Sequence, residues 1–203
     1  MIHITLLPIL QKVPSYVRQS TDVIVELQNL KTTNTDVFIQ ADVVSMYPSI
    51  KIQDGLKTLN NVIEEQRYKP TDKALILKTT EWVLRNNYMT FNNEIYLQRD
   101  GTAMGSSLSV TYACLYMAHK EKLAIDLFMS GGLKSPKLYK RMVDDIAAIF
   151  TARTDAHIFM EILKTTVDNS IKFEYEINDD GMIFMDLELY KSVVNAAEGK
   201  HTL

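Results

Sequence analysis

Three aspartates in this sequence stand where charged side chains are costly. Asp144 and Asp145 are adjacent and interrupt an otherwise apolar run over residues 142–149, and Asp42 ends another largely apolar run. An ionised carboxylate among apolar neighbours must be compensated by water, hydrogen-bond donors or cations. An Asp pair in a solvated hairpin turn would need only water. If the fold brings all three aspartates together, they instead supply the oxygen ligands that hard divalent cations take.

Such a cluster has a defined chemistry. With two Mg²⁺ ions roughly 3.5–4 Å apart, one ion activates an attacking oxygen and the other stabilises the leaving oxygen of an in-line phosphoryl displacement. The elements that carry Asp42 and the Asp144-Asp145 pair must therefore place them side by side.

Periodic patterns predict those elements. Residues 37–43 alternate between two faces, which predicts a strand with Asp42 at the end of its more polar face. Helix starts are predicted at residues 20–22, 54–55, 71–72 and 154–155, and a long helix after the small-residue turn 101–107. Hairpins are predicted from residues 88–91 with 94–97, 137–142 with 146–150, and 171–177 with 182–190.

The order of these elements is typical of an α+β fold, an antiparallel sheet backed by helices. The 203 residues contain no internal repeat, low-complexity tract or Gly/Ser linker, so we expect one domain over residues 1–203. A hydrophobic fraction of 46%, with 7 Gly and 5 Pro, is enough to build a packed core.

Composition also excludes several classes of protein. The net charge of −3 argues against a free-standing nucleic-acid binder, which normally carries a surplus of Lys and Arg. The single cysteine, Cys114, excludes an internal disulfide framework and a cysteine-rich zinc module, and is most simply a core residue. No apolar stretch is long enough to span a membrane, and residues 1–10 do not read as a secretory signal. We expect an intracellular protein, nuclear or cytoplasmic.

Three segments resemble the reverse-transcriptase motifs A, B and C in order and approximate spacing. They are residues 38–50 (FIQADVVSMYPSI), 101–109 (GTAMGSSLS) and 139–146 (YKRMVDDI). Residues 172–176 (KFEYE) and 183–187 (IFMDL) resemble motifs D and E, and the set is most similar to Penelope-like retroelements, relatives of telomerase. The resemblance implies an RNA-directed DNA polymerase palm with partial fingers and no thumb, a fragment of a longer protein. Ser107 departs from it, since the family usually has Pro there.

The resemblance also implies roles for individual residues. Asp42 and Asp144 would bind two Mg²⁺ ions, for which Mn²⁺ can substitute, the Val43 carbonyl would complete one ion's shell, and Asp145 would be an auxiliary acid. Tyr47 would lie under the sugar of the incoming dNTP and exclude a 2′-hydroxyl, although a core tyrosine is the alternative.

Further residues would contact the nucleotide or the primer. The turn residues Gly101, Thr102, Gly105 and Ser106 would approach the nascent base pair, or else form a turn without a ligand, and Lys172 would meet the departing pyrophosphate or lie solvated at a strand edge. The primer grip would consist of Ile183, Phe184, Met185, Asp186 and Leu187.

A basic stretch precedes the Asp pair, and two explanations of it stay open. Lys134, Lys137, Lys140 and Arg141 could meet a primer phosphate or form a solvated face. The expected partners are an RNA template, a DNA primer, dNTPs and the fingers and thumb of a parent protein. Two other functions remain: a catalytically incompetent or co-opted remnant that binds nucleic acid or protein, and an RNA-templated RNA polymerase, which Tyr47 disfavours.

Overall fold

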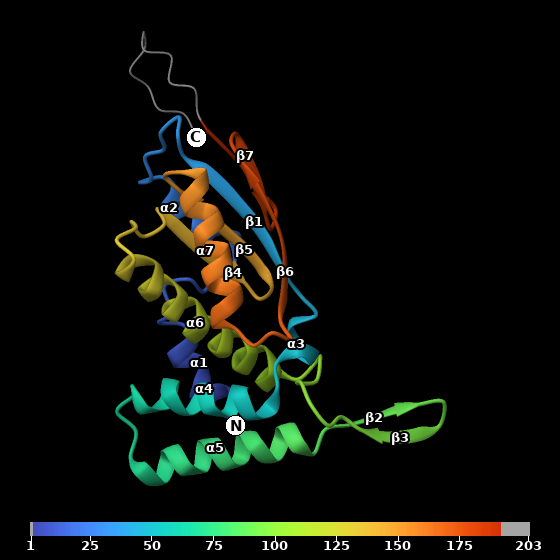
Figure 1. The fold of residues 1–203 in the computed structure, drawn as a ribbon. Coiled ribbons are helices and arrows are strands. Elements are labelled where there is room, and N and C mark those ends of the chain that lie inside the picture. Colours follow the sequence, from blue (N-terminus) through green and yellow to red (C-terminus); the bar gives the residue numbers. More distant parts are fainter. Residues whose placement is uncertain (1, 192–203) are drawn as a thin grey trace.

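The computed structural model describes residues 2–191 and has a four-stranded antiparallel sheet at its centre (Figure 1). The sheet has the strand order β4-β5-β1-β6, so β1 lies inside it. The strands are β1 (Val37–Val44), β2 (Tyr88–Phe91), β3 (Glu94–Leu97), β4 (Leu138–Met142), β5 (Asp145–Phe150), β6 (Lys172–Asn178), β7 (Gly181–Phe184) and β8 (Leu187–Tyr190). The helices are α1 (Ile2–Leu10), α2 (Ser20–Leu27), α3 (Met46–Ser49), α4 (Ile52–Glu64), α5 (Pro70–Arg85), α6 (Ser107–Ser130) and α7 (Arg153–Thr166).

The main core fills the space between one face of the sheet and the helices that cover it. Residues of β1 at alternate positions, Val37 to Val43, are buried there. Phe150 of β5 meets Phe128 of α6 edge to face at 5.7 Å, and both rings contact Phe159 of α7. Such aromatic contacts add to the hydrophobic stabilisation of the buried area. The alternation predicted for residues 37–43 is therefore confirmed.

A second, smaller core lies on the opposite face of the sheet. There Phe38 packs with Met182 and Phe184 of the β7–β8 hairpin and with Val23 of α2. The cover on this face is incomplete, because the polar end of β1 extends beyond it to Asp42, which is exposed. This uncovered end of the sheet is the part that concerns function.

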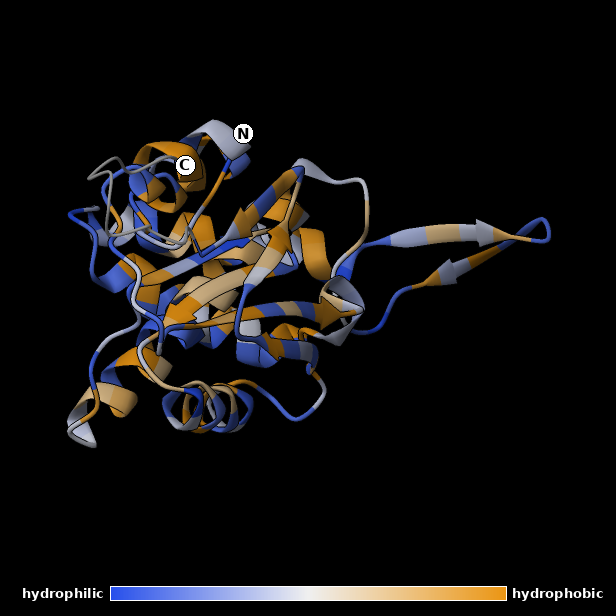
Figure 2. Ribbon diagram, turned by 90° about the horizontal axis from the view of Figure 1, so that it is seen from above, coloured by the Kyte–Doolittle hydropathy of each residue, from blue (hydrophilic) through white to orange (hydrophobic). Residues whose placement is uncertain are grey.

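The β2–β3 hairpin projects away from the body of the molecule (Figures 1 and 2). Its turn residues Asn92 and Asn93 both have positive φ, as a two-residue turn between right-twisted strands requires. Every residue of both strands is exposed. On helix α5, which precedes this hairpin in the chain, Leu75 and Trp82 are exposed as well.

One predicted hairpin is wrong. Residues 171–177 and 182–190 do not pair with each other: β6 pairs with β1, and residues 182–190 divide into β7 and β8, which pair with each other around Met185 and Asp186. Asp179 and Asp180, between β6 and β7, therefore connect two sheets. The sequence pattern could not reveal this, because a strand's alternation does not identify its partner.

The predicted α+β, palm-type architecture is otherwise confirmed, with helix starts displaced by one to three residues, as at Ile52 and Pro70. Cys114 is fully buried, as expected for a core residue. Within residues 2–191, no helix has both the length and the apolar character needed to cross a membrane.

Candidate active site

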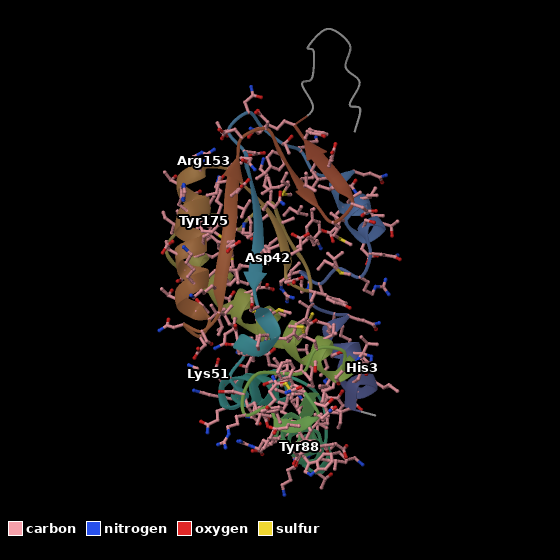
Figure 3. All side chains as sticks on the ribbon, turned by 90° about the vertical axis from the view of Figure 1, so that its right-hand side faces the viewer. His3, Asp42, Lys51, Tyr88, Arg153 and Tyr175 are labelled. Carbon is pink, nitrogen blue, oxygen red and sulfur yellow. The ribbon has the colours of Figure 1, made fainter. Side chains whose placement is uncertain are left out.

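Three carboxylates form a row across the exposed end of the sheet. Asp42 in β1 is paired in register with Asp145 of β5 on one side and with Glu174 of β6 on the other. Residues directly opposite each other in an antiparallel sheet point to the same face. Figure 3 looks onto this side of the molecule and shows Asp42 near its middle.

Asp144 joins this row from the turn between β4 and β5. The turn consists of Val143 and Asp144, and Asp144 is exposed. The backbone N–H of Val43 donates a hydrogen bond to the Asp144 carbonyl oxygen at 3.0 Å, so the turn lies against the end of β1. The predicted proximity of Asp42, Asp144 and Asp145 is therefore present in the structure.

The site is electrostatically costly. Burial, with the charges of Asp144 and Glu174, raises the pKa of Asp42 above its ordinary value. Burial likewise raises the pKa of Asp145; a hydrogen bond from the Met185 backbone N–H opposes this, while the charges of Asp144 and Asp42 add to it. Like charges and desolvation both disfavour ionisation of these carboxyl groups. A cation bound among them would offset the repulsion and favour their ionised form.

The donor set suits a hard divalent cation bound together with a ligand. In residues 2–191, no three His, Cys, Asp or Glu side chains are gathered closely enough to hold a metal ion by themselves. Mg²⁺ typically uses one or two protein carboxylates and takes its other oxygens from substrate phosphates and water. Asp42 and Asp144, on adjacent segments and open to solvent, fit that mode of binding.

A groove of about 410 Å³ runs along this face beside the carboxylate row. Its walls come from β1, the start of β5, β6 and the β7–β8 hairpin. They include Gln40, Asp42, Asp145, Glu174, Tyr175, Ile183 and Met185. The groove thus connects the carboxylates with two of the residues predicted to form a primer grip.

The predicted primer-grip segment is split between anchoring and exposed residues. Phe184 is fully buried in the second core, while Ile183 and Asp186 are exposed. The backbone N–H of Ile183 donates to the Gln40 side-chain oxygen at 3.2 Å, and that of Met185 donates to the Asp145 carboxylate at 3.1 Å. Two side chains of the sheet thus hold the hairpin backbone beside the groove.

Tyr47 lies on α3, directly after β1, where the chain turns through Ser45 with φ of +49°. The ring is half-buried and packs against the main core. Burial raises the pKa of its hydroxyl, and the charges of Cys114 and Asp144 add to the effect. Tyr47 is therefore a packed residue whose hydroxyl lies within the electrostatic influence of Asp144.

The small-residue turn packs onto α3. Gly101 has φ of +75°, and a Cβ there would stand 2.7 Å from the Pro48 backbone. The Thr102 backbone N–H donates to the Tyr47 carbonyl at 2.9 Å, and the buried Thr102 hydroxyl donates to Ser109. Gly101 and Thr102 thus fix the turn next to Tyr47 through packing and hydrogen bonds.

The other residues of the predicted nucleotide site are more open. Gly105 is exposed, with φ of +91° and no atom within 4 Å of an added Cβ. Ser106 precedes α6 and Lys172 is exposed at the start of β6, opposite Val44. Of these residues, Lys172 is placed beside the end of β1 by its pairing with Val44.

The basic stretch before the Asp pair does not form a free phosphate-binding face. Lys137 pairs with the buried Asp36, and Lys140 pairs with Glu26. Arg141 is fully buried and pairs with Glu121. Both explanations are wrong for Lys140 and Arg141, because both residues are buried and each has a carboxylate partner within the fold, whereas Lys134 is exposed.

Two features of the site escaped sequence reasoning. Glu174 lies opposite Asp42, but its strand was assigned to the wrong partner, so its place could not be known. Glu121 is buried in α6 and contacts Arg141, which lies 20 residues away in sequence. A charged residue inside an apolar helical pattern is the one signal that pointed to Glu121.

Comparisons with known proteins agree with this architecture. No protein-family model matches the chain. The telomerase reverse transcriptase of Oxytricha trifallax is 27% identical over 140 residues, which cover 64% of this chain and 12% of that protein. A structure of telomerase from Candida albicans in complex with a TWJ fragment of telomeric RNA has a TM-score of 0.73 and 13% identity, covering 93% of this chain and 37% of that chain.

A structure of the BmCPV RNA-dependent RNA polymerase at the quiescent state has a TM-score of 0.67 and 13% identity, covering 93% of this chain and 19% of that chain. The fold is therefore that of a reverse-transcriptase-like polymerase domain. Because both DNA-making and RNA-making polymerases share it, the fold leaves the choice between them to the residues of the site.

Proposed function

We propose that this chain is the palm of a reverse transcriptase and adds deoxynucleotides to the 3′-hydroxyl of a primer paired with an RNA template. The observation that carries the proposal is the juxtaposition of Asp42 with Asp144 and Asp145 beside the groove under the β7–β8 hairpin. The likeness to telomerase reverse transcriptase supports it. The motifs resemble those of Penelope-like retroelements, and we propose this type of element as the source.

We propose that Asp42 and Asp144 hold two Mg²⁺ ions, with the Val43 carbonyl completing one shell, and that Mn²⁺ can replace them. When bound, these ions would supply charge stabilisation for phosphoryl transfer. Within the chain, Asp42 and Asp144 orient the reacting groups at the end of β1. Asp145 acts through its hydrogen bond to Met185, which holds the hairpin at the groove.

The remaining residues position the nucleic acid and the nucleotide. The exposed Ile183 side chain on the hairpin would contact the primer end. Gly105 is exposed and has no side chain, so the nascent base pair could approach its backbone, and Lys172 would contact the triphosphate from the start of β6. Tyr47 would exclude a 2′-hydroxyl, which favours dNTPs over ribonucleotides.

The chain spans 12% of the length of its curated relative, so the whole protein's partners are also proposals. Among the described residues that line the groove there is no Lys or Arg. Elsewhere in the fold, Lys137, Lys140 and Arg141 are paired internally. We propose that fingers and thumb segments of a parent protein supply most contacts to template and primer phosphates. That division explains a net charge of −3 in a nucleic-acid enzyme.

Primer extension tests the proposal directly. The assay uses an RNA template, a DNA primer, dNTPs and Mg²⁺ or Mn²⁺, and compares the chain, its Asp144→Ala variant and an Asp126→Ala variant. Asp126 is an exposed acid on α6, outside the groove, and serves as the matched control. We expect extension that is lost in Asp144→Ala and kept in Asp126→Ala. The same comparison in a longer protein with fingers and thumb restored shows whether the palm suffices.

A non-catalytic remnant that binds nucleic acid or protein is the second candidate, favoured by the absence of Lys and Arg from the described lining of the groove. Calorimetric titration with Mn²⁺ separates the two candidates. Binding that disappears in Asp144→Ala supports the polymerase. The remnant would be established instead by two results together. The folded chain would bind no Mn²⁺, and a longer protein that contains it would show no primer extension.

A further inference from the structure

Arg141 is the largest side chain among those buried to less than 2% exposure. It lies on β4, two residues before Val143, and its ion-pair partner Glu121 on α6 is 1% exposed. Burying two charges is costly and often adds nothing to stability compared with apolar residues of similar size. A buried pair of this kind therefore calls for a role other than packing.

The guanidinium of Arg141 is aimed at the turn that carries Asp144. Its Nη1 donates to the Val143 carbonyl at 2.7 Å, and its Nη2 donates to the Cys114 carbonyl at 3.0 Å. Nε and Nη2 of the same guanidinium donate to the Glu121 carboxylate. One rigid, planar fork thus connects the turn to the middle of α6.

Val143 needs such an anchor. Its φ is +58°, in the left-handed region that a β-branched residue rarely adopts. This conformation is uphill by roughly 1–2 kcal/mol and persists only where surrounding contacts enforce it. Because Val143 immediately precedes Asp144, its conformation sets the direction in which the Asp144 carboxylate points.

The anchor is itself held in place. The Ser15 hydroxyl donates to Glu121 at 3.0 Å, so the carboxylate that orients Arg141 is fixed from a second side. The Arg141 backbone N–H donates to the Ser15 carbonyl at 2.7 Å, and the Arg141 carbonyl accepts from Val17 at 3.1 Å. The segment around residues 15–17 therefore closes a network around the base of the turn.

We propose that Arg141 is a positioning residue for the metal-binding carboxylate of Asp144, acting through the Val143 carbonyl. This inference rests on the proposed function, since it assigns the Asp144 carboxylate to a divalent cation. Glu121 keeps the guanidinium in place, and Val143 stores the strained conformation that the bond maintains.

Arg141→Lys tests the proposal because lysine keeps the charge for Glu121 but loses the fork that reaches Val143 and Cys114 at once. Two readouts are needed. Amide hydrogen exchange of Val43, whose N–H binds the Asp144 carbonyl, reports the placement of the turn without any metal. Calorimetry with Mn²⁺ reports the cation site. We expect Val43 exchange to accelerate at least about tenfold and Mn²⁺ affinity to fall roughly 10–100-fold.

Lys137→Met is the matched control, because it breaks the ion pair with the buried Asp36 just before the far end of β4. This variant should lower Tm. The exchange rate of Val43 relative to other amides of the sheet should stay as in the wild type, and so should the Mn²⁺ affinity. Adding Val143→Gly to Arg141→Lys should restore Mn²⁺ affinity, since glycine adopts positive φ without strain. Glu121→Gln provides a milder variant with smaller changes in the same direction if Arg141→Lys does not fold.

The outcomes separate this inference from the proposed function. If Arg141→Lys changes Val43 exchange no more than Lys137→Met does, Arg141 is merely structural and the inference is overturned, whatever the metal data show. If the wild type binds no Mn²⁺ but Val43 exchange responds selectively to Arg141→Lys, the turn is positioned by Arg141 and the proposed metal function fails alone.

Discussion

The Asp145 carboxylate accepts a hydrogen bond from the backbone N–H of Met185 at 3.1 Å, 40 residues along the chain. Met185 has φ of +58° and begins the turn between β7 and β8. One of the clustered carboxylates therefore also holds the hairpin that borders the groove. This bond connects the acids of the site with the segment predicted to hold the primer.

Replacing Asp145 tests that connection. Asp145→Ala should free the Met185 amide, because a hydrogen bond to a charged group contributes roughly 1.5–3 kcal/mol. Hydrogen exchange at Met185 should accelerate, and primer affinity should fall. Asp145→Asn keeps an oxygen acceptor, so hydrogen exchange at Met185 and primer affinity should both stay closer to the wild-type values. Equal exchange at Met185 in the wild type and in Asp145→Ala would show that the bond does not hold the hairpin.

Tyr47 should control the choice of sugar. In a protein active in primer extension, Tyr47→Ala should raise the use of ribonucleotides relative to dNTPs by roughly tenfold or more, because the ring no longer meets the 2′-hydroxyl. The ratio of kcat/KM values for the two sugars is the measurement, since loss of the half-buried ring also lowers stability. Tyr47→Phe keeps the ring and should retain discrimination. Unchanged discrimination in Tyr47→Ala would exclude this role.

The two glycines of the small-residue turn should differ in their tolerance of alanine. Both have positive φ, which costs an alanine about 1–2 kcal/mol. At Gly101 the new Cβ would also stand 2.7 Å from the Pro48 backbone, whereas at Gly105 it meets open space. Denaturant unfolding should therefore show Gly101→Ala less stable than Gly105→Ala by about 1–3 kcal/mol. Equal losses would contradict the close approach at Pro48.

The carboxylate row should make stability depend on pH. The pKa of Asp42 is raised in the folded chain. Its stabilising contribution to the free energy of unfolding is therefore fully present below about pH 3.9, the pKa of the unfolded chain, and is lost as the pH rises through the folded pKa. Without divalent cations, Asp42→Asn should raise Tm at pH 7 by roughly 1–3 °C. The gain should shrink as the pH is lowered toward 4.

Exposed Asp126 again provides the control, since Asp126→Asn should shift Tm little at either pH. Thermal unfolding of the three proteins between pH 4 and pH 7 measures the effect. A Tm for Asp42→Asn at or below that of the wild type at pH 7 would contradict repulsion within the row.

Much of the fold could be predicted from local patterns. The alternation of residues 37–43 identified β1 and placed Asp42 at its polar end, and Asn92-Asn93 identified the β2–β3 turn. The apolar flanks of the Asp144-Asp145 pair predicted two strands joined at the acids. These predictions succeeded because backbone period and turn preference are properties of neighbouring residues.

The sequence by itself thus determined most of the helices and strands, although not α1, α3 or the division of residues 182–190 into β7 and β8, and it showed which carboxylates are costly to bury. Only the tertiary structure decided the partners: β6 beside β1, which brings Glu174 to Asp42, and the buried Glu121 beside Arg141. Nothing local distinguishes an arginine for a phosphate from an arginine for a buried carboxylate. That choice depends on which distant segment lies within hydrogen-bond distance, which is settled when the helices pack on the sheet.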